Sequence, residues 1–503
     1  MKINSTVIFA LLLISFFVTI NVVVAGDPRI DFEVGSIFDA EKVGKQMRSK
    51  WSKLDKLPSS FLNESGIRQL DGKYITLYTD IASGNDVDQL PKIFDLLVIE
   101  LCKYFGVELN KYDGFHVRGF LIDDLTKFNK HGTLKDAADL RYGYSLRNQI
   151  WVRRQNSEYY QRHLFLHEGV HAFMFYAFGT FTPFWYREGI AEMLATHKFE
   201  NNKLIIGWFP TDIKSVSHLG RIEIMQKFIN NQAQNTGRGT VDISNLNYLF
   251  SLGKNTDNQV ELYAMCWCFT MFCEYHPRYR NAFRCLVFRL SESNTDFARR
   301  FIMLVAQENK IDILTAQIQL EIDWNDFKKN ICYNYDFERT AIDFRLPINN
   351  VTKNPSTKNN VNSFPDIIVQ ADRGWQNSGI KLESGRRYNL VASGRFQLAD
   401  KPNIWQSEPG GITIRYYQNM PIGKLIAMII PEPIQSNANP NPNQNPNQNI
   451  QFDVNRNFLS PEYKEIGIGV TWQPTQTGIL FLKINDAANS RSDNKGTVTV
   501  KIK

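Results

Sequence analysis

The stretch at residues 163–192, HLFLHEGVHAFMFYAFGTFTPFWYREGIAE, constrains this chain of 503 residues more than any other part. His167 and His171 are four positions apart. On a helix this spacing puts both imidazoles on one face, where two nitrogens can reach one metal ion. Glu168 lies one step around the same helix, where its carboxylate can take a proton from a zinc-held water. The spacing therefore predicts a helix that carries a zinc site with its own general base.

A second helix is predicted after a turn, in the segment WYREGIAE. Glu188 lies seventeen residues beyond His171 and is the candidate third zinc ligand, which leaves the fourth position open. Glu192 follows at i+4 on the same face, where it is expected to accept the free N–H of a ligand histidine, first of all His167. The alternative for both glutamates is a solvated helix face.

His163 lies four residues before His167, near the same stripe. We expect it to lie near the helix start and to hydrogen-bond the backbone. A part in the metal site, in contact with substrate, is the alternative.

The segments HEGVH and WYREGIAE resemble those of the gluzincin metallopeptidases, through residues His167, Glu168, His171, Glu188 and Glu192. Aminopeptidase-N-like enzymes have a similar HExxH followed by WxxEGxAE. The front half looks closer to the peptidase-MA-like group of exported bacterial proteins. The resemblance covers about residues 70–300 and implies an α+β zincin-like metallopeptidase domain.

The same resemblance implies a tyrosine on a later helix that steadies the oxyanion formed during peptide hydrolysis. The segment ELYA at 261–264 matches it, so Tyr263 is the candidate. A tyrosine of the hydrophobic core is an equal alternative.

One departure from the aminopeptidase pattern concerns the substrate. The GxMEN segment by which those enzymes hold a free amine is absent before HEGVH. The resemblance therefore favours an endopeptidase. The predicted strand at 149–153 is the candidate edge for pairing with an extended peptide, and Arg153 and Arg154 could then meet acidic side chains or be merely solubilising.

Composition and pattern divide the chain into segments. Residues 1–25, with Lys2, an apolar run and Ala25 before Gly26, predict a cleaved signal peptide, and an uncleaved anchor is the alternative. Residues 26–347 are assigned to the metallopeptidase domain, which includes an N-terminal helical segment. Residues 348–365, rich in Asn, Ser, Thr and Pro, predict a linker.

Within the first domain, periodicity predicts strands at 74–78, 116–122 and 149–153, a helix at 87–105 and mainly helices at 212–331.

Residues 366–503 predict an all-β jelly-roll or sandwich domain, because short alternating segments are separated by Gly and Asn turns. The low-complexity segment 436–449, SNANPNPNQNPNQN, predicts a mobile loop within it. The expected strands lie at 388–391, 412–416, 466–470, 478–484 and 497–502.

A turn in this domain, NDAANSRSDNKG at 485–496, collects short oxygen-bearing side chains, which calcium favours. The domain resembles the calcium-dependent galactose-binding (LecA-like) bacterial lectins, in WQNSGIKLESGRRYNLVASG, WQSEPGGI and LKINDAANSRSDNKGTVTVKI. The resemblance implies a calcium site formed by Asp486, the Ser490 carbonyl, Asp493 and Asn494, with a further carbonyl near Leu398. A turn without an ion is the alternative.

The sugar-contacting histidine of those lectins has no counterpart near Trp405, so calcium binding is better supported than galactose binding. Trp375 and Trp405 are candidates either for stacking on a sugar or for burial in the sandwich.

Charge and cysteines restrict the remaining classes. Lys and Arg number 58 against 51 Asp and Glu, which leaves a net charge of +7 without a dense basic tract, so we expect no nucleic-acid partner. The six cysteines are consistent with an oxidising compartment and form no CxxC pattern. Cys266, Cys268 and Cys273 are expected to be buried thiols, and one or two disulfide bridges remain open.

The sequence thus predicts an exported zinc metallopeptidase, secreted, periplasmic or at the cell surface, that acts on a peptide or protein substrate. Its C-terminal module is expected to bind calcium and to place the enzyme on glycans, and no membrane span is expected after signal cleavage. The alternative is a non-catalytic surface or glycan-binding protein on a zinc-stabilised pseudo-peptidase scaffold. A third interpretation is that both sites are vestigial.

Overall fold

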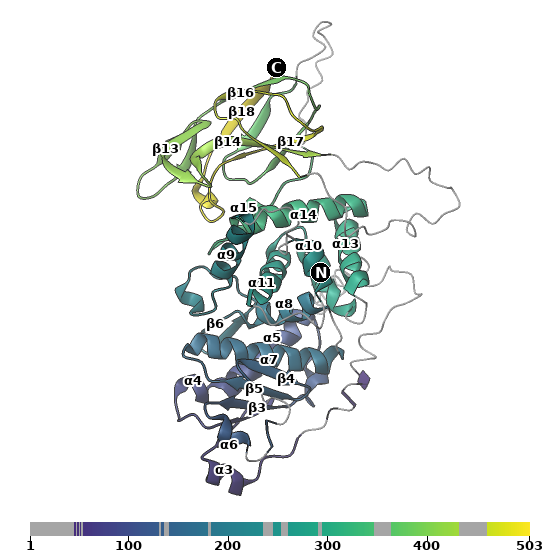
Figure 1. Cartoon of the computed structure of the whole chain (residues 1–503), viewed down its shortest axis with the longest axis vertical. Helices are drawn as coiled ribbons and strands as arrows, with labels where there is room; N and C mark the ends of the chain where they lie inside the picture. Colours follow the sequence, from purple (N-terminus) through teal and green to yellow (C-terminus); the bar gives the residue numbers. More distant parts are fainter. Residues whose placement is uncertain are drawn as a thin grey trace, which may run out of the picture.

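The computed structural model describes residues 45–46, 48–49, 51, 54–129, 132–134, 140–179, 183–234, 245–252, 260–289, 294–346, 364–431 and 460–503. The expected signal peptide, nearly all of the expected linker and the segment 436–449 lie outside these residues. The described chain has a part of mixed helices and strands up to residue 346 and a largely β part from 364 onward (Figure 1). This agrees with the coarse fold class that the sequence predicts.

A five-stranded sheet forms the base of the first part. Its order is β1-β2-β3-β5-β4, with β2, β3 and β5 parallel and the two edge strands antiparallel. The three predicted strands correspond closely to β2, β3 and β5. The strands span Arg68–Asp71 (β1), Ile75–Thr79 (β2), Val117–Ile122 (β3), Gly143–Leu146 (β4) and Gln149–Arg153 (β5).

The prediction that residues 149–153 form a free edge is wrong, because β5 lies between β3 and β4. The edge strand is β4, whose four mixed residues carry too little alternation to be recognised. Ile150 and Val152 of β5 belong to the core beneath α7, whereas Trp151 belongs to the core on the opposite face. Arg153 follows Trp151 by two positions and therefore faces away from α7.

Helices cover both faces of this sheet. α5 (Leu90–Phe105) and α7 (Glu158–Phe178) pack on one face, and α3 (Ser59–Ser65) and α6 (Leu125–Asn129) lie on the other. The predicted helix at 87–105 is interrupted, since α4 (Asn85–Asp88) precedes α5 as a separate turn. Gly169 permits close packing of α7 on α5, because a Cβ there would lie 2.7 Å from Phe94 Cε2.

A helical layer stands between the sheet and the β part. α11 is apolar on nearly every face and its centre is fully buried, as expected for the middle helix of this layer. A hairpin of β6 (His197–Glu200) and β7 (Lys203–Ile206) follows α8. The helices are α8 (Phe184–Ala195), α9 (Arg221–Gln234), α10 (Leu246–Ser251), α11 (Val260–Tyr275), α12 (Arg280–Cys285), α13 (Asn294–Asn309), α14 (Ile313–Asn330) and α15 (Phe337–Thr340).

The β part is built from two main sheets, ordered β16-β10-β18-β8 and β13-β14-β17-β9, with β15 paired to β14. The predicted strand at 466–470 is displaced, because Gly467 adopts a φ of 58° in a turn and β16 begins after it. The strands are β8 (Ile367–Gln370), β9 (Gln376–Leu382), β10 (Tyr388–Ser393), β11 (Phe396–Ala399), β12 (Trp405–Ser407), β13 (Gly410–Tyr417), β14 (Met420–Pro431), β15 (Glu462–Glu465), β16 (Gly469–Trp472), β17 (Gly478–Ile484) and β18 (Thr497–Ile502).

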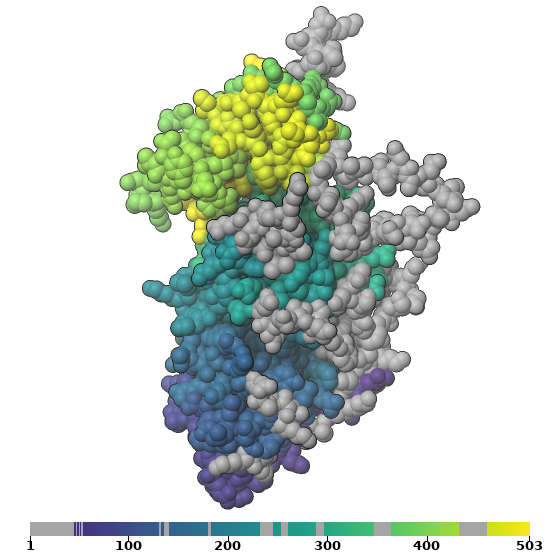
Figure 2. Space-filling model, viewed as in Figure 1, coloured from purple at the N-terminus to yellow at the C-terminus, as the bar shows by residue number. Residues whose placement is uncertain are grey.

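The β part is seated directly on the helical layer, as a lobe at one end of an elongated molecule (Figure 2). Trp375 is 2% exposed and packs with Ile322 and Ile342 in this interface, and its Nε1 donates to Asp326 Oδ1 at 3.0 Å. Of the two expectations for Trp375, burial is therefore confirmed. Trp405 is partly buried against the core of the sandwich.

All six cysteines are free thiols in the described chain, and Cys266, Cys268 and Cys273 are buried as expected. Among the described helices, none combines the length and the apolar character that crossing a membrane requires.

Candidate metal centre and a candidate calcium turn

The long helix α7 and the helix α8 bring the predicted zinc ligands together. α7 is capped by Ser157, whose side chain accepts a hydrogen bond from Tyr160 N, and it ends at Gly179 with a φ of 65°. α8 packs tightly on α11, since a Cβ on Gly189 would lie 2.4 Å from Thr270 Cγ2. This close approach holds α8 where its glutamates face α7.

Three donor atoms face one another at the centre of the site. His167 Nε2 and His171 Nε2 are 3.1 Å apart, and Glu188 Oε2 lies 3.5 Å from the first and 3.3 Å from the second. Ligands at zinc bonds of 2.0 to 2.1 Å in a tetrahedron are separated by about 3.3 Å. The triangle therefore fits one zinc ion without rearrangement of the side chains.

The charges in this cluster favour a cation. Burial would raise the pKa of Glu188, but His171 and His167 outweigh it and hold that pKa well below its usual range. Burial disfavours the imidazolium of His167, yet Glu188, Glu192 and Glu168 raise its pKa to about 9. Without metal a proton therefore sits among these donors, and metal binding would release it.

The outer oxygen of Glu188 is held by its neighbour in sequence. Arg187 Nε donates to Glu188 Oε1 at 2.8 Å, which leaves Oε2 directed at the two histidines. Sequence reasoning did not single out Arg187, because an arginine beside a predicted ligand carries no spacing signal.

Glu192 lies behind His167, as predicted, but its strongest contact is with a residue that sequence reasoning missed. Its Oε1 is 3.5 Å from His167 Nδ1, in ion-pair range but without hydrogen-bond geometry. Arg221, the first residue of α9, donates to both Glu192 oxygens at 2.9 Å, and both side chains are buried. The bidentate ion pair fixes the Glu192 carboxylate against α7.

His163, His167 and Glu192 form a second, overlapping group of metal-type donors. Both oxygens of Glu192 already accept from Arg221, so a cation is present at that carboxylate. His163 Nδ1 lies 3.1 Å from the Ala195 carbonyl, in line with the expected backbone hydrogen bond, and its Nε2 is 3.3 Å from Glu192. The geometry therefore favours the group with His171 and Glu188 for the metal.

Glu168 lies between the donor triangle and the edge strand β4. A Cβ on Gly143 would fall 2.6 Å from Glu168 Oε1, and Ser145 acts to lower the pKa of this carboxylate. Burial raises the pKa of Glu168, although His167 and His171 partly offset the effect. A carboxylate with a raised pKa is a stronger base toward water.

Tyr263, at the start of α11, is placed near the same carboxylates. Its ring meets Phe184 of α8 edge-on at 5.9 Å. Burial raises the pKa of Tyr263, and the charges of Glu188, Glu192 and Glu168 raise it further. The phenol is thus neutral at physiological pH and can donate a hydrogen bond, while its ring also packs against the core.

In the β part, the predicted calcium residues share one turn between β17 and β18. Asn494 Nδ2 donates to Asp486 Oδ2 at 2.9 Å, and Asp493 Oδ2 accepts from Asp400 N at 3.2 Å. Asn494 Oδ1 is buried without a hydrogen-bond partner among the described residues. Ser490 lies in the same turn, where its N–H donates to the Ala487 carbonyl. The donor set consists of oxygens and so fits calcium in kind.

A buried guanidinium bonds the backbone beside this turn. Arg491 is 1% exposed and donates to the backbone carbonyl of Asp486 at 2.8 Å. Burial raises the pKa of Asp486, while the charge of Arg491 acts to lower it. The strand β11 runs beside the turn, with Gln397 Nε2 donating to the Asp493 carbonyl at 2.8 Å, so the Leu398 segment is adjacent as expected.

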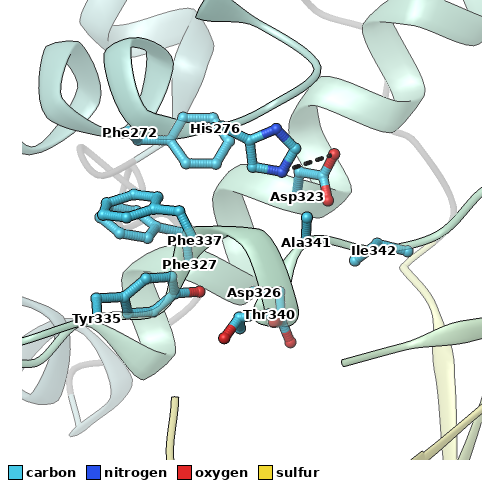
Figure 3. A pocket seen from close by; sticks show the side chains of 10 residues that line it. All are labelled: Phe272, His276, Asp323, Asp326, Phe327, Tyr335, Phe337, Thr340, Ala341 and Ile342. Carbon is cyan, nitrogen blue, oxygen red and sulfur yellow. Dashed lines mark ion pairs between the residues drawn. The ribbon is translucent and has the colours of Figure 1, made fainter. Parts of the chain in front are cut away.

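A separate small cavity lies between α11, α14 and α15, close to the β part (Figure 3). His276 and Asp323 lie beside each other in its lining, with His276 Nε2 3.8 Å from Asp323 Oδ2. The cavity has room for about one water molecule, which excludes a peptide or sugar.

Comparison with known proteins gives limited information. No protein-family profile matches the chain. No curated protein sequence matches it either. Among solved structures, the chain is similar to a domain described as "EclA N-terminal domain; PllA-like lectin", at 19% identity and a TM-score of 0.19, over 28% of this chain and 96% of that domain. We transfer no function from this match.

Proposed function

We propose that this protein is a zinc-dependent metallopeptidase of gluzincin type that hydrolyses internal peptide bonds. The observation that carries the proposal is the triangle of His167, His171 and Glu188, with sides that suit one zinc ion and with Glu168 beside it. A structural zinc site needs four protein ligands, whereas this triangle supplies three. Three ligands with an adjacent carboxylate favour a catalytic site.

The residues around the triangle have separate tasks in this proposal. Bound zinc would supply Lewis-acid chemistry, polarising a water molecule and the peptide carbonyl. Glu168 takes the proton from the attacking water and passes it to the leaving amine. Tyr263 donates a hydrogen bond to the oxygen that gains charge in the transition state. Arg187 and Arg221 keep Glu188 and Glu192 in place.

The edge strand β4 is the proposed platform for the peptide. Its outer side has no partner strand among the described residues, and its Gly143 and Ser145 contact Glu168. An extended peptide that pairs with β4 would pass directly over the base. β4 replaces β5 in the role that the sequence suggested.

The decisive experiment compares the wild type with Glu168→Gln, using metal analysis and a library of peptides derived from a proteome. We expect both proteins to hold one zinc per chain, and the variant to lose about a thousandfold or more in hydrolysis, because general-base catalysis contributes 10² to 10⁴. Comparable hydrolysis by Glu168→Gln would refute the mechanism. Zinc binding with no hydrolysis by either protein would favour the rival, a zinc-stabilised scaffold whose β part does the binding.

For the β part we propose a calcium site at Asp486, the Ser490 carbonyl, Asp493 and Asn494, in a module that places the enzyme on glycans. The support is the oxygen donor set and the unpartnered, buried Asn494 Oδ1. Export of the protein is proposed from residues 1–25 alone. Calcium titration by calorimetry tests the site, and heat identical to that of an Asp486→Ala variant would rule it out.

A further inference from the structure

Arg187 holds Glu188 in place at the candidate zinc site but takes no direct part in the proposed proton transfers. Arg187 precedes the ligand Glu188 on α8 and hydrogen-bonds its outer oxygen through Nε. The Arg187 side chain remains 36% exposed, whereas that of Glu188 is 7% exposed. The guanidinium therefore extends from the buried ligand to the solvent side of the site.

The guanidinium of Arg187 packs beside an aromatic pair. Its guanidinium carbon lies 5.8 Å from the centre of the Phe184 ring, which in turn contacts Tyr263. Burial raises the pKa of Tyr263, and the positive charge of Arg187 acts in the opposite direction. Phe184 thus connects the partly exposed Arg187 with Tyr263, the proposed oxyanion donor.

A guanidinium in this position can still bind a second anion. It has five N–H donors, and its contact with Glu188 involves only Nε. The two terminal nitrogens present parallel N–H groups that match a carboxylate. A lysine could not hold Glu188 and a second carboxylate in the same planar geometry.

Positive charge also flanks the strand β4, which lies beside Glu168. The edge strand β4 is flanked by Arg141 and Arg147, both exposed, and its own sequence GYSL has no acidic residue. A peptide lying along β4 would therefore run between arginines. Complementary charge raises both the rate of encounter and the selectivity of binding.

We propose that Arg187 binds a carboxylate of the substrate, so that the site selects peptides with an acidic group near the scissile bond. The proposal rests on the proposed peptidase function and names its substrate class. The carboxylate comes from an Asp or Glu side chain or from the C-terminus of the peptide.

The test uses the zinc-loaded full chain and sets of peptides matched except at one position. Glu, Gln and Lys are exchanged at each position beside the cleaved bond in C-terminally amidated peptides, and a further Gln peptide has a free C-terminus. In the wild type we expect the Glu peptide to exceed the Gln peptide about tenfold in kcat/KM, as a charge-assisted hydrogen bond allows. A preference for the free C-terminus over the amide would identify the terminal carboxylate as the source.

The Arg187→Gln variant should bring these ratios close to one, and Arg187→Lys should keep part of the preference. The ratio between peptides is the readout, because loss of the contact with Glu188 is expected to lower hydrolysis of every peptide. Arg386→Gln is the matched control, since Arg386 is exposed in the β part and pairs there with Glu383. Equal Glu-to-Gln ratios in wild type and Arg187→Gln, at equal zinc content, would overturn the proposal.

A binding experiment distinguishes failure of the proposed peptidase function from failure of the proposed carboxylate recognition. If no peptide is hydrolysed, the same peptides, labelled with a fluorophore, are titrated with zinc-loaded Glu168→Gln and with Glu168→Gln/Arg187→Gln. Tighter binding of the carboxylate peptides that disappears with Arg187 supports the recognition. Equal binding of all peptides by both variants refutes it.

Discussion

The two candidate metal sites of this protein differ in where their arginines lie. At the α7–α8 site, Arg187 and Arg221 stand behind Glu188 and Glu192 and bond them from outside. In the turn of the β part, the buried Arg491 bonds the backbone carbonyl of Asp486 and not its carboxylate. The same chemical group therefore acts differently in the two places. At the α7–α8 site it holds carboxylates so that the metal donors face a common centre.

The difference has a simple electrostatic meaning. A cation that bonds a carboxylate fixes its orientation and keeps it ionised, whereas a buried cation that bonds only the backbone near a metal site orients no ligand and repels the metal. Asn494 and Asp400 also donate hydrogen bonds to Asp486 and Asp493, so those oxygens already have partners. We therefore expect tight zinc binding at α7–α8 and weak calcium binding in the turn.

Among the variants that test this comparison, Glu188→Ala is expected to have the largest effect on metal affinity. The variant loses one side of the donor triangle, so zinc affinity should fall by more than the roughly 100-fold that loss of an outer partner costs. Competition with a chelator measures the affinity. Glu158→Ala, at an exposed position of α7, is the control. Unchanged zinc affinity in Glu188→Ala would remove this residue from the ligand set and erase the contrast between the regions.

A smaller effect is expected from Arg221→Met, which leaves the donors intact but releases Glu192. Zinc affinity should fall by about 10- to 100-fold, because outer partners orient the ligand histidine. The buried Glu192 would also be left without its partner, at a cost of about 3 to 5 kcal/mol in unfolding free energy.

Two further variants separate the orienting role of Arg221 from its role in stability. Arg221→Lys should recover part of the zinc affinity. The double variant Arg221→Met/Glu192→Gln should recover stability, measured by chemical denaturation, without recovering zinc affinity. If Arg221→Met kept the zinc affinity of the wild type, the arginine behind the donors would have no part in orienting the ligand histidine.

The smallest effect is expected in the turn of the β part. Arg491→Met removes the competing charge, and calcium affinity should rise by about tenfold, the equivalent of roughly 1.4 kcal/mol. Calorimetry measures the change, with Asp486→Asn as the variant that should lose binding. A fall in calcium affinity on Arg491→Met would mean that the arginine supports the turn and that the proposed contrast is wrong.

The same turn should respond to pH. Burial raises the pKa of Asp486, and protonation removes the charge that calcium needs. Calcium affinity should therefore decline at a higher pH than for exposed aspartates, and titrations between pH 7 and 4 would detect it.

The strands β2, β3 and β5 and the division into a mixed part and a β part could be predicted, because apolar periodicity is local. The edge strand β4 could not, because four residues of mixed polarity become a strand only through pairing with β5. The prediction consequently named β5, and not β4, as the free edge that could pair with a peptide.

The candidate zinc donors on α7 and the candidate base follow from the sequence alone, because helix geometry fixes His167, Glu168 and His171 relative to one another. Glu188 and Glu192 were predicted from the segment WYREGIAE, but a turn separates their helix from the first, so only the tertiary structure shows that they face the histidines. The contacts of Arg221 and Ser145 with this site were decided only by the tertiary structure. They reach it from α9 and β4, and no local spacing relates residues whose distance is set by packing.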